Sequence, residues 1–470
     1  MPRPVRGIFY GEYFVFASCS RPVWLMLLAL LGFALSSWAT PFQGYGWHDQ
    51  QRVAQLLLLL LACGFVLFAR AFVAGRFVWP VLAILTLGGV SALHAELPVW
   101  AMREWALQAG LVILALVLAQ LLKPESAQWA VACIAVVVGG GLALQFFVGY
   151  AAAFISGIRM LDAFTLFSGF SNPRFFGQFQ IFLMPLLVAL VLHCQVKHPG
   201  LAGLVMVVLV GQWCIAYALG GRGLILGLLV AHASLLFLRI EFLRFISVQL
   251  IAALIGLLLF WLLFCLVPIW LGWELTLRDT LRTGLSAREV LWLEALELII
   301  RQPWLGVGPM HFSARINPVA AHPHQMLLQW ASEWGIPAAL GVMMLAAWGM
   351  LSAARWLRRE CVAGMDAALW VGLVGGLILA QVDGVFVMPY TQIWMTVFVG
   401  MALARWSLCQ PSSEMQRHLI MLTGLLVAVV LGGVVIAEAP HLPEIQQRFI
   451  ELHAIGNRPR FWSQGWIVAP

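Results

Sequence analysis

The sequence predicts an all-α polytopic membrane protein with about 12–13 transmembrane helices and one long hydrophilic loop. Of the 470 residues, 62% are hydrophobic and 10% are charged, whereas a soluble domain typically carries about 25% charged residues. Thirteen apolar stretches are long enough, or nearly so, to cross roughly 30 Å of hydrocarbon as helices.

The apolar stretches divide the chain into four parts. Residues 1–271 hold about nine spans, 272–336 form a long loop with short helices, 337–437 hold the remaining spans, and 438–470 form a tail. The stretches begin near Val23, Val53, Phe77, Trp105, Ala127, Phe176, Leu201, Gly223, Ser247, Pro337, Ala367, Gln392 and Leu419. The eleventh is the weakest because glycines and Asp383 dilute it, so 12 and 13 spans both stay open.

The basic residues indicate the side of each loop. With a cytoplasmic N-terminus, fourteen of the 27 basic residues lie on the cytoplasmic side, as the positive-inside rule expects. The long loop and the tail then face outward. The net charge of +7 therefore reflects topology and does not indicate nucleic-acid binding. The first apolar stretch lacks a convincing small-residue cleavage site, so no cleavable signal peptide is expected.

Several common sites have no counterpart in the sequence. The eight cysteines form no close pair and no metal-ligand spacing, so buried, unreactive thiols are expected. The five aspartates include no Asp-x-Asp, the acidic pair that holds a metal ion against a diphosphate. Phosphate-binding lysine loops, serine nucleophile elbows and HExxH zinc motifs are also missing. The sequence therefore predicts neither a metal nor a cofactor.

The long loop contains the most informative motif, His322-Pro323-His324-Gln325, followed by an apolar run. Its spacing predicts a helix that begins near His324 and stops at Gly335. The N-terminus of a helix disfavours a charged imidazole and attracts anions such as phosphate. His324 is therefore a candidate proton acceptor beside a bound phosphate. The alternative is a histidine that merely caps a helix.

Three arginines on the outer side are unusual because charge at membrane depth is costly and tends to mark function. Arg222 follows two glycines between two apolar spans, and its planar fork suits a pair of phosphate oxygens. It can also serve as an interfacial anchor. Arg174 lies in an outward turn with Asn172 and Gln178, a polar cluster that either hydrogen-bonds a sugar or phosphate or closes the turn.

The third arginine, Arg288, belongs to the capping box Ser286-Ala287-Arg288-Glu289, which predicts the start of a helix. Helical periodicity places Arg288 on an apolar face with Leu291 and Ala295, and we expect this face to pack onto the membrane domain. The opposite face carries Glu294, Glu297 and Arg301. A buried cation needs an anionic partner, which is either a ligand or a carboxylate in a structural salt bridge.

These motifs, in this order, resemble the bacterial superfamily of O-antigen ligases, O-antigen polymerases and protein O-oligosaccharyltransferases. The resemblance covers most of the chain from about Phe167 to Met401. Its carriers are Asn172-Pro173, Gly221-Arg222-Gly223, Ser286-Ala287-Arg288 with Trp292, Pro303-Trp304-Leu305-Gly306-Val307-Gly308-Pro309, and His322-Pro323-His324-Gln325-Met326-Leu327-Leu328-Gln329.

The resemblance implies a metal-independent inverting glycosyltransferase in the bacterial inner membrane. Such an enzyme moves a glycan from undecaprenyl diphosphate to an acceptor hydroxyl at the periplasmic face. Matching positions place Arg222 and Arg288 on the donor diphosphate and His324 at the acceptor hydroxyl. The weaker substrate-binding candidates are His322, Arg174, Gln178, Asn172 and Gln325.

The chain departs from the family pattern at three positions. Gln325 stands where asparagine is frequent, and Gly221 stands where serine is frequent. We expect both changes to preserve the mechanism. Arg174 replaces an asparagine that is common after Asn-Pro, which points to a different glycan or acceptor.

The sequence is compatible with three classes of acceptor. The proline and histidine motif is more typical of protein O-transferases with a pilin-like acceptor, and a ligase acting on lipid A core comes next, followed by an O-antigen polymerase. A lipid-linked glycan transporter is the alternative outside this class, but transporters usually place polar residues near the midplane and repeat their halves.

The tail ends in an aromatic and basic segment, residues 459–466, which we expect to lie on the membrane surface or to contact a partner.

Overall fold

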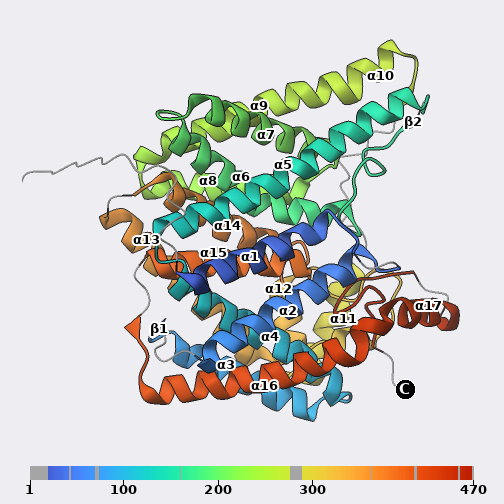
Figure 1. The fold of residues 1–470 in the computed structure, drawn as a ribbon. Helices are drawn as coiled ribbons and strands as arrows, with labels where there is room; N and C mark the ends of the chain where they lie inside the picture. Colours follow the sequence, from blue (N-terminus) through green and yellow to red (C-terminus); the bar gives the residue numbers. More distant parts are fainter. Residues whose placement is uncertain are drawn as a thin grey trace, which may run out of the picture.

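Each of the thirteen apolar stretches forms a helix in the computed structural model (Figure 1). The structure describes residues 20–41, 44–68, 73–158, 160–275, 288–360, 362–406, 410–453 and 456–467. The thirteen helices are α1 (Arg21–Ala34), α2 (Trp47–Phe68), α3 (Val78–His94), α4 (Pro98–Leu121), α5 (Glu125–Ile155), α6 (Pro173–Cys194), α7 (Pro199–Ala218), α8 (Arg222–Leu238), α9 (Leu243–Trp261), α13 (Ile336–Arg359), α14 (Gly364–Leu379), α15 (Pro389–Arg405) and α16 (Glu414–Glu438).

Length and composition make this an all-α polytopic membrane protein, as predicted. Among the described residues, eight helical segments are long and apolar enough to cross a bilayer, and four shorter apolar helices accompany them. α15 adds another helix of 17 residues. The choice between 12 and 13 crossings, and the division of the chain into four parts, stay predictions.

The remaining elements are short. Turns of 3-10 or π-helix are η2 (Leu35–Ser37), η3 (Ile240–Phe242), η4 (Leu262–Leu266), η5 (His311–Ala314) and η6 (Ala439–His441). Short helices are α10 (Val267–Trp270), α11 (Arg288–Arg301), α12 (Met326–Trp334) and α17 (Leu442–His453). Two-residue strands are β1 (Val73–Ala74), β2 (Met160–Leu161), β3 (Glu274–Leu275) and β4 (Gln410–Pro411).

Two strand pairs mark opposite ends of the bundle. β1 pairs with β4 in antiparallel fashion, and β2 pairs with β3 in parallel fashion. β1 lies at the left of Figure 1 and β2 at the right. The end with β2 and β3, which we call the site end, also holds the connections at 219–221 and 380–388, the long loop and the C-terminal tail. This is the arrangement expected if the long loop and the tail share one side of the membrane.

α4 and α6 form the centre of the bundle. In their most apolar windows 78% and 83% of the residues are buried, against 17% for α13 at the periphery. α6 packs against α7 and α14, and α4 packs against α2, α15 and α16. The site end therefore rests on central helices that are surrounded by protein.

The motif from Pro303 to Pro309 fixes the C-terminal end of α12. Val307 N donates to Ser332 O at 2.9 Å, and Gly308 N donates to Glu333 O at 3.0 Å. Gly306 has a φ of 67°, and a Cβ atom there would lie 2.4 Å from the Glu333 carbonyl carbon. This close approach of two backbones explains the glycine.

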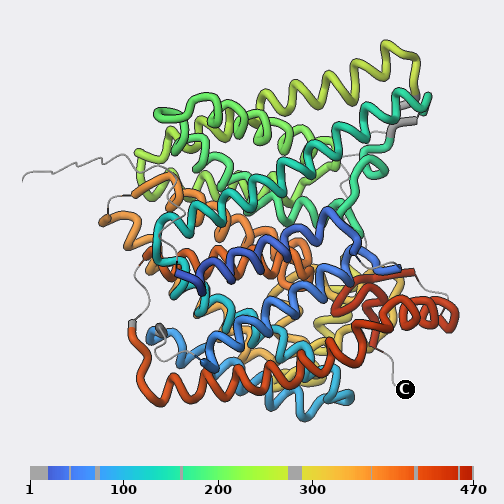
Figure 2. Tube along the Cα trace, viewed as in Figure 1, coloured from blue at the N-terminus to red at the C-terminus, as the bar shows by residue number. Residues whose placement is uncertain are grey.

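The C-terminal tail corrects one expectation. Arg460, Phe461, Trp462 and Trp466 are each at most 2% exposed, so this segment lies inside the protein and not on a membrane surface. Figure 2 shows the red C-terminal residues folded back beside the yellow segment that contains α11. The mixture of aromatic and basic residues is typical of a segment on a membrane surface. Here the aromatic rings are buried in the protein core, and Arg460 pairs with Glu333 at 2.6 Å.

Trp334 docks α12 onto α3 at Gly88, and this contact can be tested. A Cβ atom at Gly88 would lie 1.8 Å from the Trp334 ring, so we expect Gly88→Ala to lower the free energy of unfolding by roughly 1–3 kcal/mol through overpacking. Gly89→Ala is the matched control, because its Cβ would lie 3.5 Å from Trp105. Thermal unfolding in detergent checks this; equal stability of the two variants would contradict the docking.

Candidate active site

α12 presents His324 just before its first turn. Gln325 caps this helix, since its Oε1 accepts a hydrogen bond from Leu328 N at 2.6 Å. The helix begins at Met326, slightly later than predicted, and ends at Gly335 as predicted. His324 has a φ of 55°, a left-handed conformation that is uncommon for a residue other than glycine. Its side chain is 19% exposed, so the imidazole stays accessible.

Asp383 lies beside His324. Its Oδ1 is 3.4 Å from His324 Nδ1 and accepts a hydrogen bond from Gly384 N at 2.8 Å. Burial raises the pKa of Asp383, but the contact with His324, the bond from Gly384 and the charge of Arg288 outweigh it, so the pKa lies below its ordinary value. Asp383 is therefore a carboxylate at neutral pH.

The contact at 3.4 Å is long for a hydrogen bond, and such contacts in ligand-free sites often tighten when substrate binds. A carboxylate at Nδ1 favours the tautomer with the proton on Nδ1, which leaves Nε2 as the basic nitrogen. The arrangement orients His324 as a proton acceptor.

His322 packs against His324 on the buried side of this pair. It is 2% exposed, and its ring centroid lies 4.0 Å from that of His324. His324 N donates to His322 Nδ1 at 3.3 Å. Burial first, then the neighbouring imidazoles and arginines, hold the pKa of His322 well below its usual range. A Cβ atom on Gly384 would lie 2.6 Å from the His322 ring. His322 is thus a neutral side chain packed between its own loop, which carries His324, and the loop that carries Asp383.

Three arginines lie in the first described turns of three helices. Arg174 is the second residue of α6, Arg222 the first of α8, and Arg288 the first described residue of α11. Burial lowers the pKa of Arg288, Asp383 raises it, and Arg174 and Arg222 lower it by repulsion. Arg288 is therefore within electrostatic reach of the other three charges.

This placement of the arginines is unfavourable without an anion. The N-terminus of a helix carries partial positive charge, so a cation in the first turn is repelled. Arg174 and Arg222 are exposed and Arg288 is partly buried. Backbone N–H groups and guanidinium groups together bind phosphate well. The cluster is suited to a multiply charged anion.

The other candidates lie in supporting positions. Asn172 caps α6, because its Oδ1 accepts from Arg174 N at 2.9 Å. Gln325, besides its capping bond, donates to Gln381 Oε1 at 3.0 Å. Gln178 is fully buried and accepts from Thr391 Oγ1 at 2.8 Å. The structure therefore does not bring Gln178 to the cluster, and the substrate-binding roles of all three stay predictions.

α11 packs differently from the expectation. Its apolar residues Leu291, Ala295 and Leu298 form a cluster with Phe312 and Ala320 of the same loop, and the helix packs against α12. It therefore does not pack onto the membrane domain, because the loop supplies its own apolar partners. Ser286 and Ala287 lie outside the described residues, so the capping box stays a prediction.

The opposite face of α11 is polar, as predicted. Glu297 contacts Arg301 at 2.6 Å and Arg315 at 3.3 Å, and Glu294 accepts from Asn317 at 3.1 Å. This face orients α11 in the loop without contributing to the arginine cluster.

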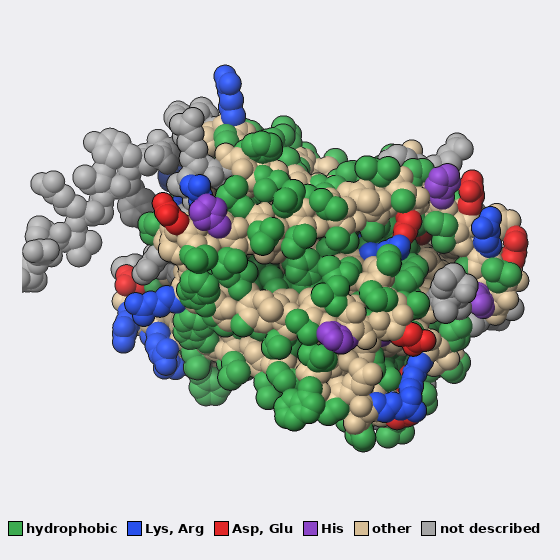
Figure 3. All heavy atoms as spheres, turned by 90° about the horizontal axis from the view of Figure 1, so that it is seen from below, with side chains coloured by type: hydrophobic (Ala, Val, Ile, Leu, Met, Phe, Trp, Pro, Cys, Tyr) green, Lys and Arg blue, Asp and Glu red, His purple; other side chains and the backbone are tan. Residues whose placement is uncertain are grey.

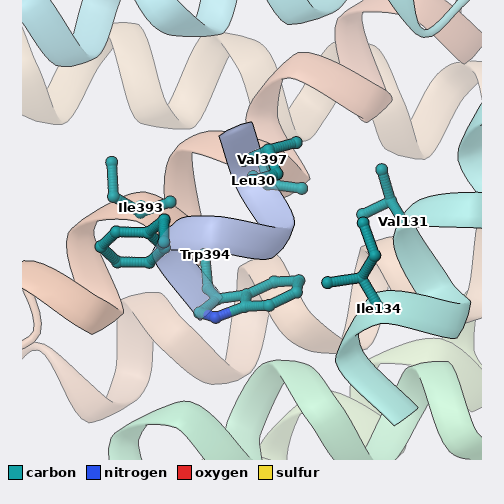
Figure 4. Close-up of a pocket in the computed structure, with 7 residues that line it drawn as sticks. Leu30, Val131, Ile134, Ile393, Trp394 and Val397 are labelled. Carbon is teal, nitrogen blue, oxygen red and sulfur yellow. The ribbon is translucent and has the colours of Figure 1, made fainter. Parts of the chain in front are cut away.

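Charged side chains gather at the two ends of the molecule, with a mainly apolar surface between them (Figure 3). Figure 4 shows a cavity among α1, α5 and α15. Its lining residues are Leu30, Phe33, Val131, Ile134, Ile393, Trp394 and Val397. Because none of them is titratable, this cavity does not supply acid or base chemistry. Among the described residues, no three His, Cys, Asp or Glu side chains gather into a group that holds a metal ion.

Residues 204–343 match the family model described as O-antigen ligase. This segment of the chain is similar to the O-antigen ligase family. The matched residues contain Arg222, Arg288, His322 and His324, so most of the candidate site lies within the matching region.

A curated relative has the same family name. The O-antigen ligase of Pseudomonas aeruginosa is 30% identical over 141 residues, which are 28% of this chain. The match spans about a third of the length of that relative, 33%. Activity, substrates and partners are therefore argued from the site below.

Sequence reasoning missed Asp383 as a functional residue. It was read as a polar residue that weakens the eleventh apolar stretch. The criterion that singled out the arginines, a charge at membrane depth, applies equally to an aspartate. Its contact with His324 joins positions 59 residues apart (383 − 324 = 59), and no local pattern marks such a pair.

Proposed function

We propose that this protein is a metal-independent inverting glycosyltransferase that moves a glycan from undecaprenyl diphosphate to an acceptor hydroxyl. The observation that carries the proposal is the electrostatic interaction of Arg288 with Arg174, Arg222 and Asp383, together with the contact between Asp383 and His324. The arginines suit an anionic leaving group, and the His324–Asp383 pair suits removal of a proton. The similarity of residues 204–343 to the O-antigen ligase family supports this reaction class.

The arginine cluster assists departure of the diphosphate. The bond between the anomeric carbon and the phosphate oxygen breaks, and its electron pair leaves with the lipid diphosphate. Arg222 and Arg288 neutralise the growing charge in a partly buried site, where fixed cations stabilise a transition state strongly. Arg174 adds a third positive charge at the same place.

His324 removes the acceptor proton. The acceptor oxygen forms its bond to the anomeric carbon on the face opposite the diphosphate, and its proton passes to His324 Nε2. Attack from that face inverts the anomeric configuration. Asp383 stabilises the imidazolium that results, because it is an anion 3.4 Å from Nδ1. General base catalysis of this kind contributes about 10²–10⁴ in rate.

The distribution of basic residues favours a site on the periplasmic side of the bacterial inner membrane. They concentrate at the other end of the bundle, where the positive-inside rule places the cytoplasm. There Arg405 lies 2.6 Å from Asp366, and Arg239 lies 3.1 Å from Glu241.

The acceptor is either a pilin-like protein or lipid A core. The His322-Pro323-His324 motif favours a protein hydroxyl, and the name of the Pseudomonas relative favours a ligase. The site chemistry is the same for both, since each offers a hydroxyl to His324. The two acceptors are therefore compared directly in the experiment.

Glycan transfer by the purified protein tests the proposal. The assay contains an undecaprenyl-diphosphate glycan, a metal chelator, and pilin and lipid A core as competing acceptors. We expect product on one acceptor, which also names the branch of the superfamily. An intact donor with neither product would contradict the proposal and favour a transporter, whereas a donor converted to longer lipid-linked glycans would favour a polymerase.

His324→Ala removes the base, so we expect kcat to fall by about 10²–10⁴-fold with little change in donor KM. Asp383→Asn keeps the shape of the pair but removes its charge, and we expect a smaller loss of kcat. His441→Ala is the control, because this side chain is 60% exposed on the tail. Steady-state transfer kinetics measure all three; unchanged kcat in His324→Ala would show that another group takes the proton.

Arg288→Lys keeps the charge but loses the planar fork. A charged hydrogen bond contributes about 1.5–3 kcal/mol, so we expect kcat/KM for the donor to fall by about 10- to 100-fold. Arg301→Lys on the same helix is the matched control, because Arg301 pairs with Glu297 on the polar face. Equal kcat/KM for the two variants would exclude a two-point contact between Arg288 and the diphosphate.

A further inference from the structure

The two members of the His324–Asp383 pair lie on separate loops, and the C-terminal segment, residues 456–467, contacts both the loop of His324 and α2. Its side chains are buried: Arg460 and Trp462 are 1% exposed, and Phe461 is fully buried. Apolar contacts alone would be enough to pack such a segment against the helices. This one places a charged side chain and several backbone carbonyls against the loops of the candidate site.

Arg460 holds the histidine loop. Its Nη1 donates to Ala321 O at 3.3 Å, immediately before His322. Its Nη2 donates to Glu333 Oε2 at 2.6 Å, at the far end of α12. Both charged side chains are 1% exposed. One guanidinium therefore fixes the segment that carries His324 on both sides.

A second attachment reaches the same loop. Ile467 N donates to Ser313 O at 3.1 Å, and Ser313 Oγ donates to Ala321 O at 2.8 Å. Ala321 O thus accepts from Arg460 and from a serine that the C-terminal segment itself holds. The backbone before His322 has little freedom to move independently of this segment.

Arg52 of α2 holds the aspartate loop against the same segment. Its Nη2 donates to Val387 O at 2.7 Å, in the connection that contains Asp383, and to Arg460 O at 2.8 Å. Its Nε donates to Phe461 O at 2.9 Å. Arg52 is 1% exposed. Its position ties the end of the aspartate loop to the C-terminal segment.

Backbone and amide hydrogen bonds from the histidine loop fix the beginning of the aspartate loop. Met326 N donates to Ala380 O at 3.0 Å, and Gln325 donates to Gln381 at 3.0 Å. The far side, at Val387, is held through Arg52. The two loops are therefore joined at one side by α12 and at the other by the C-terminal segment.

We infer that the C-terminal segment is a positioning element of the active site, which sets the geometry of the His324–Asp383 pair through Arg460 and Arg52. This inference rests on the proposed function for its meaning in catalysis. Arg460 and Glu333 are positioning residues; they do not touch substrate. Because proton transfer depends steeply on geometry, small shifts of the loop reduce turnover.

The test compares two buried ion pairs. Removing one partner leaves an unpaired buried charge, so the variant is the double substitution Glu333→Gln with Arg460→Gln. The matched control is Asp366→Asn with Arg405→Gln, since that pair also lies at 2.6 Å but at the opposite end of the bundle. Arg460→Lys is a third variant, which keeps the charge next to Glu333 but cannot donate to two groups with the same geometry.

We expect the Glu333→Gln/Arg460→Gln protein to lose about 10²-fold in kcat with donor KM unchanged, because Arg174, Arg222 and Arg288 are untouched. We expect Arg460→Lys to lose less kcat than the double variant. We expect the control to keep the wild-type kcat and donor KM. A kcat loss no larger than that of the control, or a parallel rise in donor KM, would overturn the inference.

A second readout does not depend on activity. Mass spectrometry measures the rate at which diethyl pyrocarbonate modifies His324, and we expect this rate to rise in Glu333→Gln/Arg460→Gln and not in the control. An unchanged rate would overturn the inference even if turnover fell. If the wild-type protein transferred no glycan, the proposed function would fail while the modification rate still reported on the positioning of His324.

Discussion

Arg174 and Arg222 repel Arg288, and this repulsion is the constraint on which the candidate site depends. The protein compensates for it in part with Asp383, whose charge raises the pKa of Arg288 against the effects of burial and of the other arginines. A compact arrangement of this kind is stable only where rigid elements hold it. α6 and its neighbours supply that rigidity, since most of α6 is buried among other helices. Under the proposed function, the donor diphosphate supplies the remaining negative charge.

Asp383 has two electrostatic partners, and this connects the two halves of the proposed reaction. It lies near Arg288 on the side of the leaving group and 3.4 Å from His324 on the side of the acceptor. When an anion neutralises the arginines, the carboxylate is freer to stabilise a positive imidazole. Donor binding and activation of the base are thus expected to support each other. The buried C-terminal segment keeps these groups in place.

Much of the architecture was accessible from the sequence because it depends on local patterns. Long apolar runs form helices in a bilayer, since every backbone group must be hydrogen-bonded within the segment. The start of α12 after His324 followed from apolar spacing, and its end followed from Gly335. Arg222, Arg288 and His324 stood out because charge or polarity there is costly without a role. Their catalytic roles stay predictions.

The parts that were missed depend on contacts between distant positions. Asp383 meets His324, and Arg460 meets Glu333 across 127 residues (460 − 333 = 127). The tail has the composition of an interfacial segment, and only the tertiary structure shows that its aromatic rings are buried. α11 likewise presented an apolar face that we predicted to pack onto the membrane domain, whereas its partners belong to the same loop.

The most direct measurement of the central claim is a structure of the protein with a non-hydrolysable undecaprenyl-diphosphate sugar. We predict diphosphate oxygens within hydrogen-bond distance of Arg222 and Arg288, and the anomeric carbon on the side of His324 Nε2. A diphosphate bound elsewhere, or one whose sugar points away from His324, would contradict the claim that these groups form one active site.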